Sequence, residues 1–217
     1  MIRVVIADDQ TLVRSGFRMI LEPEEDIEVV ADVGEGAAAV AAAAALRPDG
    51  MLMDVRMPGM DGIEATRRIM RSDHPPQIVV LTTFDLDELV FEALRAGASA
   101  FLLKDASADQ LVSAIRVAAD GGSLFVPSLT GRLIDRFSRD SDPAPPAELS
   151  ELTGREREVL VLLARGHSNA EIARELVVTD HTVKTHIARI LAKLGLRNRT
   201  QAVIAAYESA LVTPRQR

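Results

Sequence analysis

The sequence predicts an α/β fold, a doubly wound parallel sheet, followed by a second, smaller all-α domain. In residues 1–122, short apolar runs alternate five times with segments of helical periodicity, whereas residues 148–212 carry helical patterns only. The charge also changes sign. Residues 1–147 hold 14 Lys and Arg against 24 Asp and Glu, while residues 148–217 hold 11 against 8. Such a change indicates that the two parts meet different partners.

Composition excludes several classes of protein. The 217-residue chain has no cysteine, which excludes disulfides and thiolate metal sites. No uncharged run exceeds eleven residues, whereas a bilayer span needs ~20, so we expect a soluble protein with no membrane partner. Because Asp8 and Asp9 fall where the apolar core of a signal peptide would lie, we expect a cytoplasmic location.

Five strand-and-helix repeats account for the first domain. The apolar runs expected to form strands lie at residues 2–7, 27–31, 50–54, 77–83 and 100–104. The expected helices lie at residues 11–21, 36–46, 62–70 and 87–95, with a fifth between Ser107 and Gly121. Near-continuous apolar strands indicate a parallel sheet that is covered on both faces and connected right-handedly. This is a flavodoxin-like (βα)5 arrangement.

Polar side chains stand where these strands end: Asp8, Asp9, Asp54, Thr82 and Lys104. Any one of them alone is most often a helix cap or a surface ion-pair partner. Ligands of open α/β sheets, however, bind outside the carboxyl ends of the strands, so all five could face one crevice. Magnesium prefers oxygen ligands. Asp9 and Asp54 suit direct coordination of the ion, and Asp8 suits coordination through a water molecule. An aspartate can also attack phosphorus, with the metal, Lys104 and Thr82 neutralising the phosphate oxygens.

A proline-rich break at residues 140–147 separates the two parts. Such segments are extended and semi-rigid, so residues 123–147 are predicted to be a linker, with a possible short helix at residues 130–137. The second domain is predicted at residues 148–212, and residues 213–217 form a tail.

Four helices are expected in the second domain, at residues 153–163, 168–176, 180–194 and 200–211. Capping-box patterns open the first two, and the second and third are joined by a tight turn, as in a helix-turn-helix. On the third helix, residues 183, 187, 190, 191 and 194 form an apolar stripe. The opposite face presents Thr182, Lys184, Thr185, Ala188 and Arg189. Such a face can reach DNA phosphates and base edges, although a solvated face or a protein-binding module is the alternative.

The strand-end motifs closely resemble the receiver domain of bacterial two-component response regulators, over roughly residues 1–122. The motifs are Asp8-Asp9, residues 53–62 (MDVRMPGMDG), Leu81-Thr82 and Leu103-Lys104. The resemblance implies that a sensor histidine kinase phosphorylates Asp54. It also implies a Mg²⁺ (or Mn²⁺) site formed by Asp8, Asp9, Asp54 and the backbone carbonyl of Arg56. Thr82 and Phe101 would switch together, Thr82 drawn to the phosphate and Phe101 turning inward.

Thr83 departs from many receivers, in which this position is small. We hypothesise that its bulk hinders a hydrolytic water and lengthens the life of the phosphorylated state.

The second domain is similar to the DNA-binding domain of LuxR-type transcription factors, on residues 152–160 (LTGREREVL), 168–173 (SNAEIA) and 182–187 (TVKTHI). Together the two domains resemble NarL/FixJ-type response regulators. The resemblance implies that Lys184 and Thr185 meet base edges and that Arg189 and Lys193 hold phosphates. At Ala188, where some relatives carry a longer polar side chain, base readout is thinner or limited to a thymine methyl. The last helix resembles a dimerisation helix through Val203, Ala206, Tyr207 and Ala210, with core packing as the alternative.

The predicted function is transcription regulation by a phosphorylated response regulator, and not enzymatic turnover. The expected partners are a sensor histidine kinase, double-stranded DNA and, on phosphorylation, a second copy of the chain, with RNA polymerase as a further candidate. Two alternatives stay open. One is a magnesium phosphohydrolase that works through an aspartyl phosphate, and the other is a constitutive DNA binder whose receiver only dimerises.

Overall fold

The computed structural model describes residues 1–83, 87–120 and 148–212, which divide into two compact units on either side of residues 121–147. The predicted linker, its short helix and the C-terminal tail lie outside the described residues, as does the boundary predicted after residue 122. No helix of the described residues is both long enough and apolar enough to cross a bilayer.

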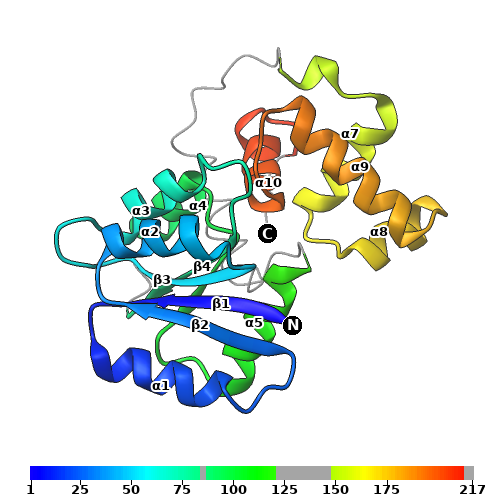
Figure 1. Cartoon of the computed structure of the whole chain (residues 1–217). Helices are drawn as coiled ribbons and strands as arrows, with labels where there is room; N and C mark the ends of the chain where they lie inside the picture. Colours follow the sequence, from blue (N-terminus) through cyan, green and yellow to red (C-terminus); the bar gives the residue numbers. More distant parts are fainter. Residues whose placement is uncertain (84–86, 121–147, 213–217) are drawn as a thin grey trace. The chain divides into compact units, whose positions relative to one another are not determined.

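The first unit contains a five-stranded parallel sheet in the order β2-β1-β3-β4-β5. Its strands are β1 (Ile2–Ala7), β2 (Ile27–Val33), β3 (Gly50–Asp54), β4 (Gln77–Thr82) and β5 (Ala100–Leu103). Its helices are α1 (Thr11–Leu21), α2 (Gly36–Leu46), α3 (Gly62–Ile69), α4 (Asp87–Ala96) and α5 (Ala108–Ala119). Helices α1 and α5 cover one face of the sheet, and α2, α3 and α4 cover the other (Figure 1). The flavodoxin-like prediction is therefore confirmed.

In the first unit the largest difference from the predicted elements is at β2, which extends two residues further than expected. After a register shift between Val4 and Val5, β1 continues to pair with β2 as far as Ala7 and Val33. Backbone pairing with a neighbour thus extends the strand beyond its apolar run. The other ends in this unit differ by about one residue, as is usual where helices and strands fray. In the second unit the last predicted helix, residues 200–211, ends early, at Glu208.

An aliphatic core holds the sheet against α1 and α5. It includes Val4, Ile6, Leu52, Val79 and Leu81 from the strands and Phe17, Leu21, Leu111 and Ile115 from the helices. Full burial of each large aliphatic side chain contributes roughly 1.5–3 kcal/mol. This packing fixes the strands in register, and the register in turn places the residues at their carboxyl ends.

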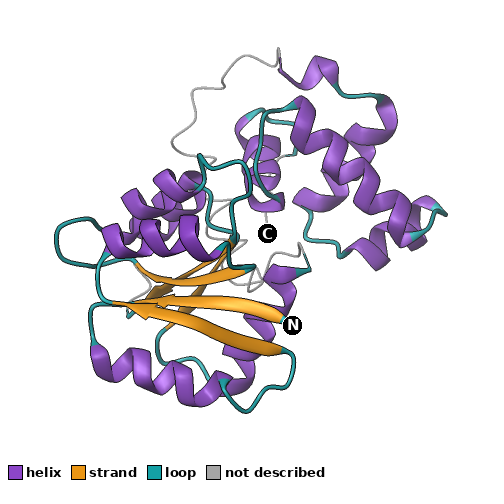
Figure 2. Ribbon diagram, viewed as in Figure 1, coloured by secondary structure: helices purple, strands orange, loops and turns teal. Residues whose placement is uncertain are grey.

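Over residues 148–212, the described part of the second unit, the chain forms helices and no strand (Figure 2). It contains η1 (Glu148–Glu151), α7 (Gly154–Ala164), α8 (Asn169–Leu176), α9 (Asp180–Lys193) and α10 (Arg199–Glu208). The four predicted helices and both predicted capping boxes are present. The 3-10 turn η1 was not predicted because four residues are too few to show helical periodicity. It contributes Leu149 to the core of this unit.

Candidate metal centre and nucleic-acid interface

Strand register brings the predicted strand-end residues to one edge of the sheet. Ala7 of β1 pairs with Met53 of β3, so Asp8 and Asp54 follow at the same level. Asp54 in turn pairs with Leu81, the residue before Thr82. Asp8 and Asp54 are 46 positions apart in the sequence. They meet because neighbouring parallel strands end at the same edge of the sheet.

Three carboxylates form the centre of this edge. One carboxylate oxygen from each of Asp8, Asp9 and Asp54 lies within 4.8 Å of the others. Asp8 and Asp54 are buried, whereas Asp9 is exposed. Two buried like charges so close together require a compensating cation.

Lys104 supplies part of that compensation. Its Nζ donates to Asp54 Oδ2 at 2.8 Å and lies 2.6 Å from Asp8 Oδ2. Burial raises the pKa of Asp54, against the opposing effect of the Lys104 hydrogen bond. Burial also disfavours the charged form of Lys104, but contacts with the two carboxylates outweigh it and raise the pKa of Lys104. The lysine is therefore held as a cation between two acids.

The carboxylate oxygens of this cluster suit a divalent cation. Asp8 Oδ1 accepts from Gln10 N at 2.9 Å, and Asp54 Oδ1 accepts from Arg56 N at 3.3 Å. Asp8 Oδ2 is buried and accepts no well-aligned hydrogen bond from the described residues, although it contacts Lys104. Magnesium takes oxygen ligands and commonly only one or two carboxylates, with waters and phosphate completing its shell. The acidic cluster meets those requirements.

Three further predicted receiver residues lie on β4, directly after it, and on β5. Thr82 is buried at the end of β4, where its carbonyl accepts from Lys104 N at 2.8 Å. Thr83 is exposed one residue further on. Phe101 is already buried on β5, opposite Val80. The proposed ligand role of the Arg56 carbonyl stays a prediction.

Gly62 is a site residue whose role the sequence pattern did not reveal, because it was interpreted only as a break after the strand. A Cβ at this position would lie 1.9 Å from the carbonyl oxygen of Asp54 and 2.9 Å from its carbonyl carbon. The first residue of α3 therefore packs directly on the backbone of Asp54, where no side chain fits.

The predicted two faces of α9 are present in the second unit. Val183 and Ile190 are buried, and Ile187, Leu191 and Leu194 pack against the same core. The other face leaves exposed Lys184, Ala188 and Arg189. This face offers two cations and one small apolar side chain to a ligand.

Two hydroxyl groups of the predicted DNA face are already engaged. Thr182 Oγ1 lies 2.8 Å from Thr179 Oγ1, and Thr179 caps α9 by accepting from Thr182 N. Thr185 Oγ1 donates to the carbonyl of His181 at 3.0 Å. A base contact by either hydroxyl would have to share or replace these hydrogen bonds.

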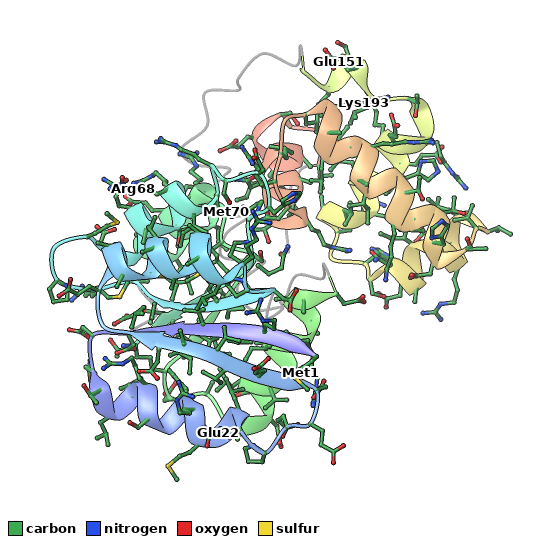
Figure 3. The ribbon with its side chains drawn as sticks, in the orientation of Figure 1. Met1, Glu22, Arg68, Met70, Glu151 and Lys193 are labelled. Carbon is green, nitrogen blue, oxygen red and sulfur yellow. The ribbon has the colours of Figure 1, made fainter. Side chains whose placement is uncertain are left out.

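Lys193 is placed differently from the other predicted DNA contacts. Its Nζ donates to Glu156 Oε2 at 2.6 Å and to the Glu151 carbonyl at 3.1 Å, and Figure 3 shows Lys193 close to Glu151. Glu156 is only 3% exposed. The ammonium group therefore compensates a buried charge, a role that competes with the predicted phosphate contact.

Helix α10 and the residues directly after it include those predicted for dimerisation. Val203 and Ala206 are buried within their own unit, and Tyr207 Oη donates to the carbonyl of Ala164 at 2.8 Å. Ala210 is exposed beyond the end of the helix. This arrangement favours core packing, the stated alternative, for the first three residues.

Each of the two units matches a known protein family. Residues 4–116 match the response regulator receiver domain, and residues 150–206 match the bacterial regulatory proteins of the luxR family. The transcriptional regulatory protein LiaR of Bacillus subtilis (strain 168) is 43% identical over 212 residues, which cover 98% of this chain and all of LiaR. The response regulator VraR of Staphylococcus aureus (strain NCTC 8325 / PS 47) is 41% identical, over 97% of this chain and 99% of VraR.

Solved structures give the same result. The response regulator ChrA of a heme-sensing two-component system is 36% identical, with a TM-score of 0.53 over 97% of this chain and 98% of ChrA. The receiver domain of NarL from Mycobacterium tuberculosis is also 36% identical, with a TM-score of 0.54 over 55% of this chain and 97% of that domain. The chain therefore belongs to the LuxR-family response regulators, in which a receiver domain is followed by a LuxR-type DNA-binding domain.

Proposed function

We propose that a sensor histidine kinase phosphorylates Asp54 in the cytoplasm and that phosphorylation controls homodimerisation and promoter binding, with RNA polymerase as a further partner. The observation that carries this proposal is the environment of Asp54. This carboxylate is buried at a strand end, bonded to Lys104 and grouped with Asp8 and Asp9. A site that gathers one lysine and three acids suits the transfer of an anionic group.

The chemistry follows from the positions of these side chains. An Asp54 carboxylate oxygen attacks phosphorus, the bond from phosphorus to the histidine nitrogen breaks, and the electron pair leaves with the imidazole. Lys104 neutralises one phosphate oxygen, and the Thr82 hydroxyl donates to another. Mg²⁺, when held by Asp8, Asp9, Asp54 and the Arg56 carbonyl, would neutralise a further oxygen.

Phosphorylation must change the contacts of Lys104 if it is to act as a switch. In the structure this lysine bonds the Asp54 carboxylate that would become the acyl phosphate. A phosphoryl group shifts a conformational equilibrium only through contacts that differ between the two states. Lys104 and Thr82 are the proposed sources of that difference, and Phe101 on the neighbouring strand is the proposed responder.

The proposed DNA interface is the exposed face of α9. Lys184 and Arg189 provide cations for base edges and phosphates, and Ala188 can contact a thymine methyl. Thr182 and Thr185 border this face. Because cations dominate the interface, binding should weaken steeply with salt, and affinities must be compared at one stated salt concentration.

Asp54→Asn is expected to abolish the response to phosphoryl donors. In a DNA-binding titration of the purified full chain, acetyl phosphate or beryllofluoride with Mg²⁺ should tighten wild-type binding by about tenfold or more. The variant should show no change, because its amide cannot accept the phosphoryl group. Analytical ultracentrifugation of the same samples tests dimerisation. Equal affinities for wild type and Asp54→Asn under both conditions would support the constitutive binder instead.

A phosphohydrolase remains the enzymatic alternative. It predicts repeated turnover of a small phosphomonoester with Mg²⁺ that is lost in Asp54→Asn. The response-regulator proposal instead predicts about one phosphoryl group accepted per chain from a donor, followed by slow hydrolysis. Measuring phosphate release over many equivalents of substrate distinguishes the two.

Thr83→Ala is expected to shorten the life of the phosphorylated state severalfold. Thr83 is exposed directly after the buried Thr82, so its side chain can obstruct a water that approaches the acyl phosphate. The measurement is the decay of phosphorylated protein after removal of the donor, with Thr83→Ser as a control that keeps the hydroxyl but not the methyl group. Unchanged decay in the alanine variant would remove this role.

A further inference from the structure

Arg14 on α1 contacts the acidic cluster from outside. Its Nη1 donates to the backbone carbonyl of Asp8 at 2.7 Å, and its Nη2 donates to Thr11 Oγ1 at 3.1 Å. Its Nε faces Asp32 Oδ1 at 3.4 Å. The side chain is only 15% exposed. One planar guanidinium thus joins α1, the end of β1 and β2, and its orientation is fixed on three sides.

This contact completes the restraints on Asp8. The amide of Asp8 donates to the Val33 carbonyl at 3.1 Å, and its Oδ1 accepts from Gln10 N. Arg14 holds the carbonyl, so Asp8 Oδ2 is left directed to the cluster with Asp54 and Lys104. The carbonyl of Asp8 also belongs to the peptide bond that carries Asp9. Movement of this carbonyl would therefore shift both acids.

Gly34 has no side chain, and the guanidinium of Arg14 lies next to it. A Cβ at this position would lie 3.4 Å from Arg14 Nη1 and 3.9 Å from the Asp8 carbonyl oxygen. Any longer side chain directed along this Cβ would compete with the contact between Arg14 and Asp8. The arrangement thus depends on a small residue at the end of β2 as well as on the arginine.

We propose that Arg14 is a positioning residue for the metal centre: it sets the orientation of Asp8 and Asp9 and thereby raises their affinity for a divalent cation. The inference rests on the proposed metal-dependent function. Groups that orient metal ligands typically change metal affinity by roughly 10–100-fold when they are replaced. Arg14 itself ligates nothing, since a guanidinium has no lone pair to offer a cation.

Arg18 provides a matched control on the same helix. It lies one turn after Arg14, and its Nη2 contacts Asp32 Oδ2 at 2.5 Å, but its described contacts are with Asp32 and Glu22 and not with Asp8. Replacing either arginine with methionine removes one positive charge and one ion pair with Asp32. Loss of charge alone would strengthen cation binding in both variants, because a nearby positive charge repels the metal. Loss of positioning weakens binding in the Arg14 variant only, so the two effects have opposite signs.

Isothermal titration of the full-length chain with Mg²⁺ alone tests the proposal. Arg14→Met is expected to raise the Mg²⁺ dissociation constant by about tenfold, and Arg18→Met by less than about twofold. Arg14→Lys should recover part of the lost affinity, because the ammonium keeps the positive charge and can donate to one of the three acceptors. It lacks the planar fork with which the guanidinium spans all three. Thermal unfolding without metal shows whether both variants are folded. It also gives a second readout, since the Mg²⁺-induced rise in unfolding temperature should be smallest for Arg14→Met.

The outcomes separate this inference from the function on which it rests. If wild type binds no Mg²⁺, the proposed metal centre is wrong. If wild type binds and the two methionine variants have equal affinities, or Arg14→Met binds more tightly than wild type, Arg14 has no positioning role. If Arg14→Met proves unfolded, the comparison of Arg14→Lys with Arg18→Lys decides, and equal affinities there reject the proposal.

Discussion

Gly62→Ala is expected to prevent phosphoryl acceptance by Asp54 and to destabilise the receiver domain by about 3 kcal/mol. The added Cβ would lie 1.9 Å from the carbonyl oxygen of Asp54, far inside any contact distance. Its second neighbour is the carbonyl carbon of the same residue, at 2.9 Å. The clash is therefore with backbone, and no flexible side-chain tip can move to relieve it.

Neither side of this contact can shift freely. Gly62 N donates to the Val55 carbonyl at 2.9 Å, and the Gly62 carbonyl accepts from Thr66 Oγ1 at 2.7 Å. Asp61 caps α3 by accepting from Glu64 N at 2.7 Å. Relief of the clash must therefore move either the start of α3 or the end of β3. Displacement of β3 takes the Asp54 carboxylate away from Lys104, and the hydrogen bond of 2.8 Å between them is lost.

Chemical denaturation and labelling by acetyl phosphate measure the two effects of Gly62→Ala. Gly16→Ala is the matched control, because a Cβ at Gly16 has no neighbour within 4 Å and alanine favours a helix by about 1 kcal/mol over glycine. That variant should be slightly more stable than wild type and fully labelled. A Gly62→Ala protein that unfolds like wild type and accepts the phosphoryl group would contradict the predicted clash.

The sequence allowed the positions of Asp8, Asp54 and Lys104 to be predicted because each follows directly after an apolar run. Parallel strands end at a common edge, so alternating strands and helices are sufficient to bring such residues together. The capping boxes of α7 and α8 were predictable for a similar reason. In a capping box, each of two side chains accepts a hydrogen bond from the backbone of the other residue, three positions away. Both partners therefore lie within a four-residue sequence pattern.

Contacts between distant segments were not predictable in the same way. The close approach of Gly62 to Asp54 depends on how α3 packs, and the bond from Arg14 to the Asp8 carbonyl depends on a backbone atom that no sequence pattern marks. Glu156 was predicted only as part of the capping-box pattern that opens at Thr153, and Lys193 only through a family resemblance. Their ion pair crosses 37 residues. Motifs thus predicted which residues end strands or cap helices, but not which of them share a partner.

Glu156 has two partners that the structure brings together at the start of α7. Its Oε2 accepts from Thr153 N at 2.9 Å and from Lys193 Nζ at 2.6 Å. Lys193 also donates to the Glu151 carbonyl at 3.1 Å. One buried carboxylate therefore joins the N-terminus of α7 to the last residue of α9, the helix whose exposed face is the proposed DNA interface.

Lys193→Met is expected to destabilise the DNA-binding domain by about 2–3 kcal/mol, because it leaves a buried carboxylate without its cation. Glu156→Gln together with Lys193→Met should restore much of that loss, since glutamine can still cap α7 and no charge remains unpaired. Denaturant unfolding of the single and double variants measures the coupling. Equal stabilities of Lys193→Met and wild type would show that the ion pair contributes nothing.

The pH dependence of unfolding provides an independent check on the same pair. The hydrogen bond from Lys193, followed by that from the Thr153 amide, lowers the pKa of Glu156 from its ordinary value of 4.5 to about 2. A carboxyl whose pKa is lower in the folded state stabilises fully above its unfolded value. This contribution is therefore lost as the pH falls from about 4.5 to about 2. The stability difference between wild type and Lys193→Met should shrink across this interval, and a constant difference would contradict the assignment.

Salt dependence then decides whether Lys193 also touches DNA. Log affinity falls linearly with log salt concentration, and each lysine that contacts a phosphate makes this fall steeper by about 0.9. Removal of such a lysine therefore reduces the magnitude of the slope by about 0.9. If Lys193 only holds α9 through Glu156, Lys193→Met and Glu156→Gln should weaken DNA binding at every salt concentration without changing the slope. Arg189→Met is the control, because its side chain is exposed on the proposed DNA face and its removal should lower the slope. A reduced slope in Lys193→Met, with an unchanged slope in Glu156→Gln, would instead assign Lys193 to the DNA backbone.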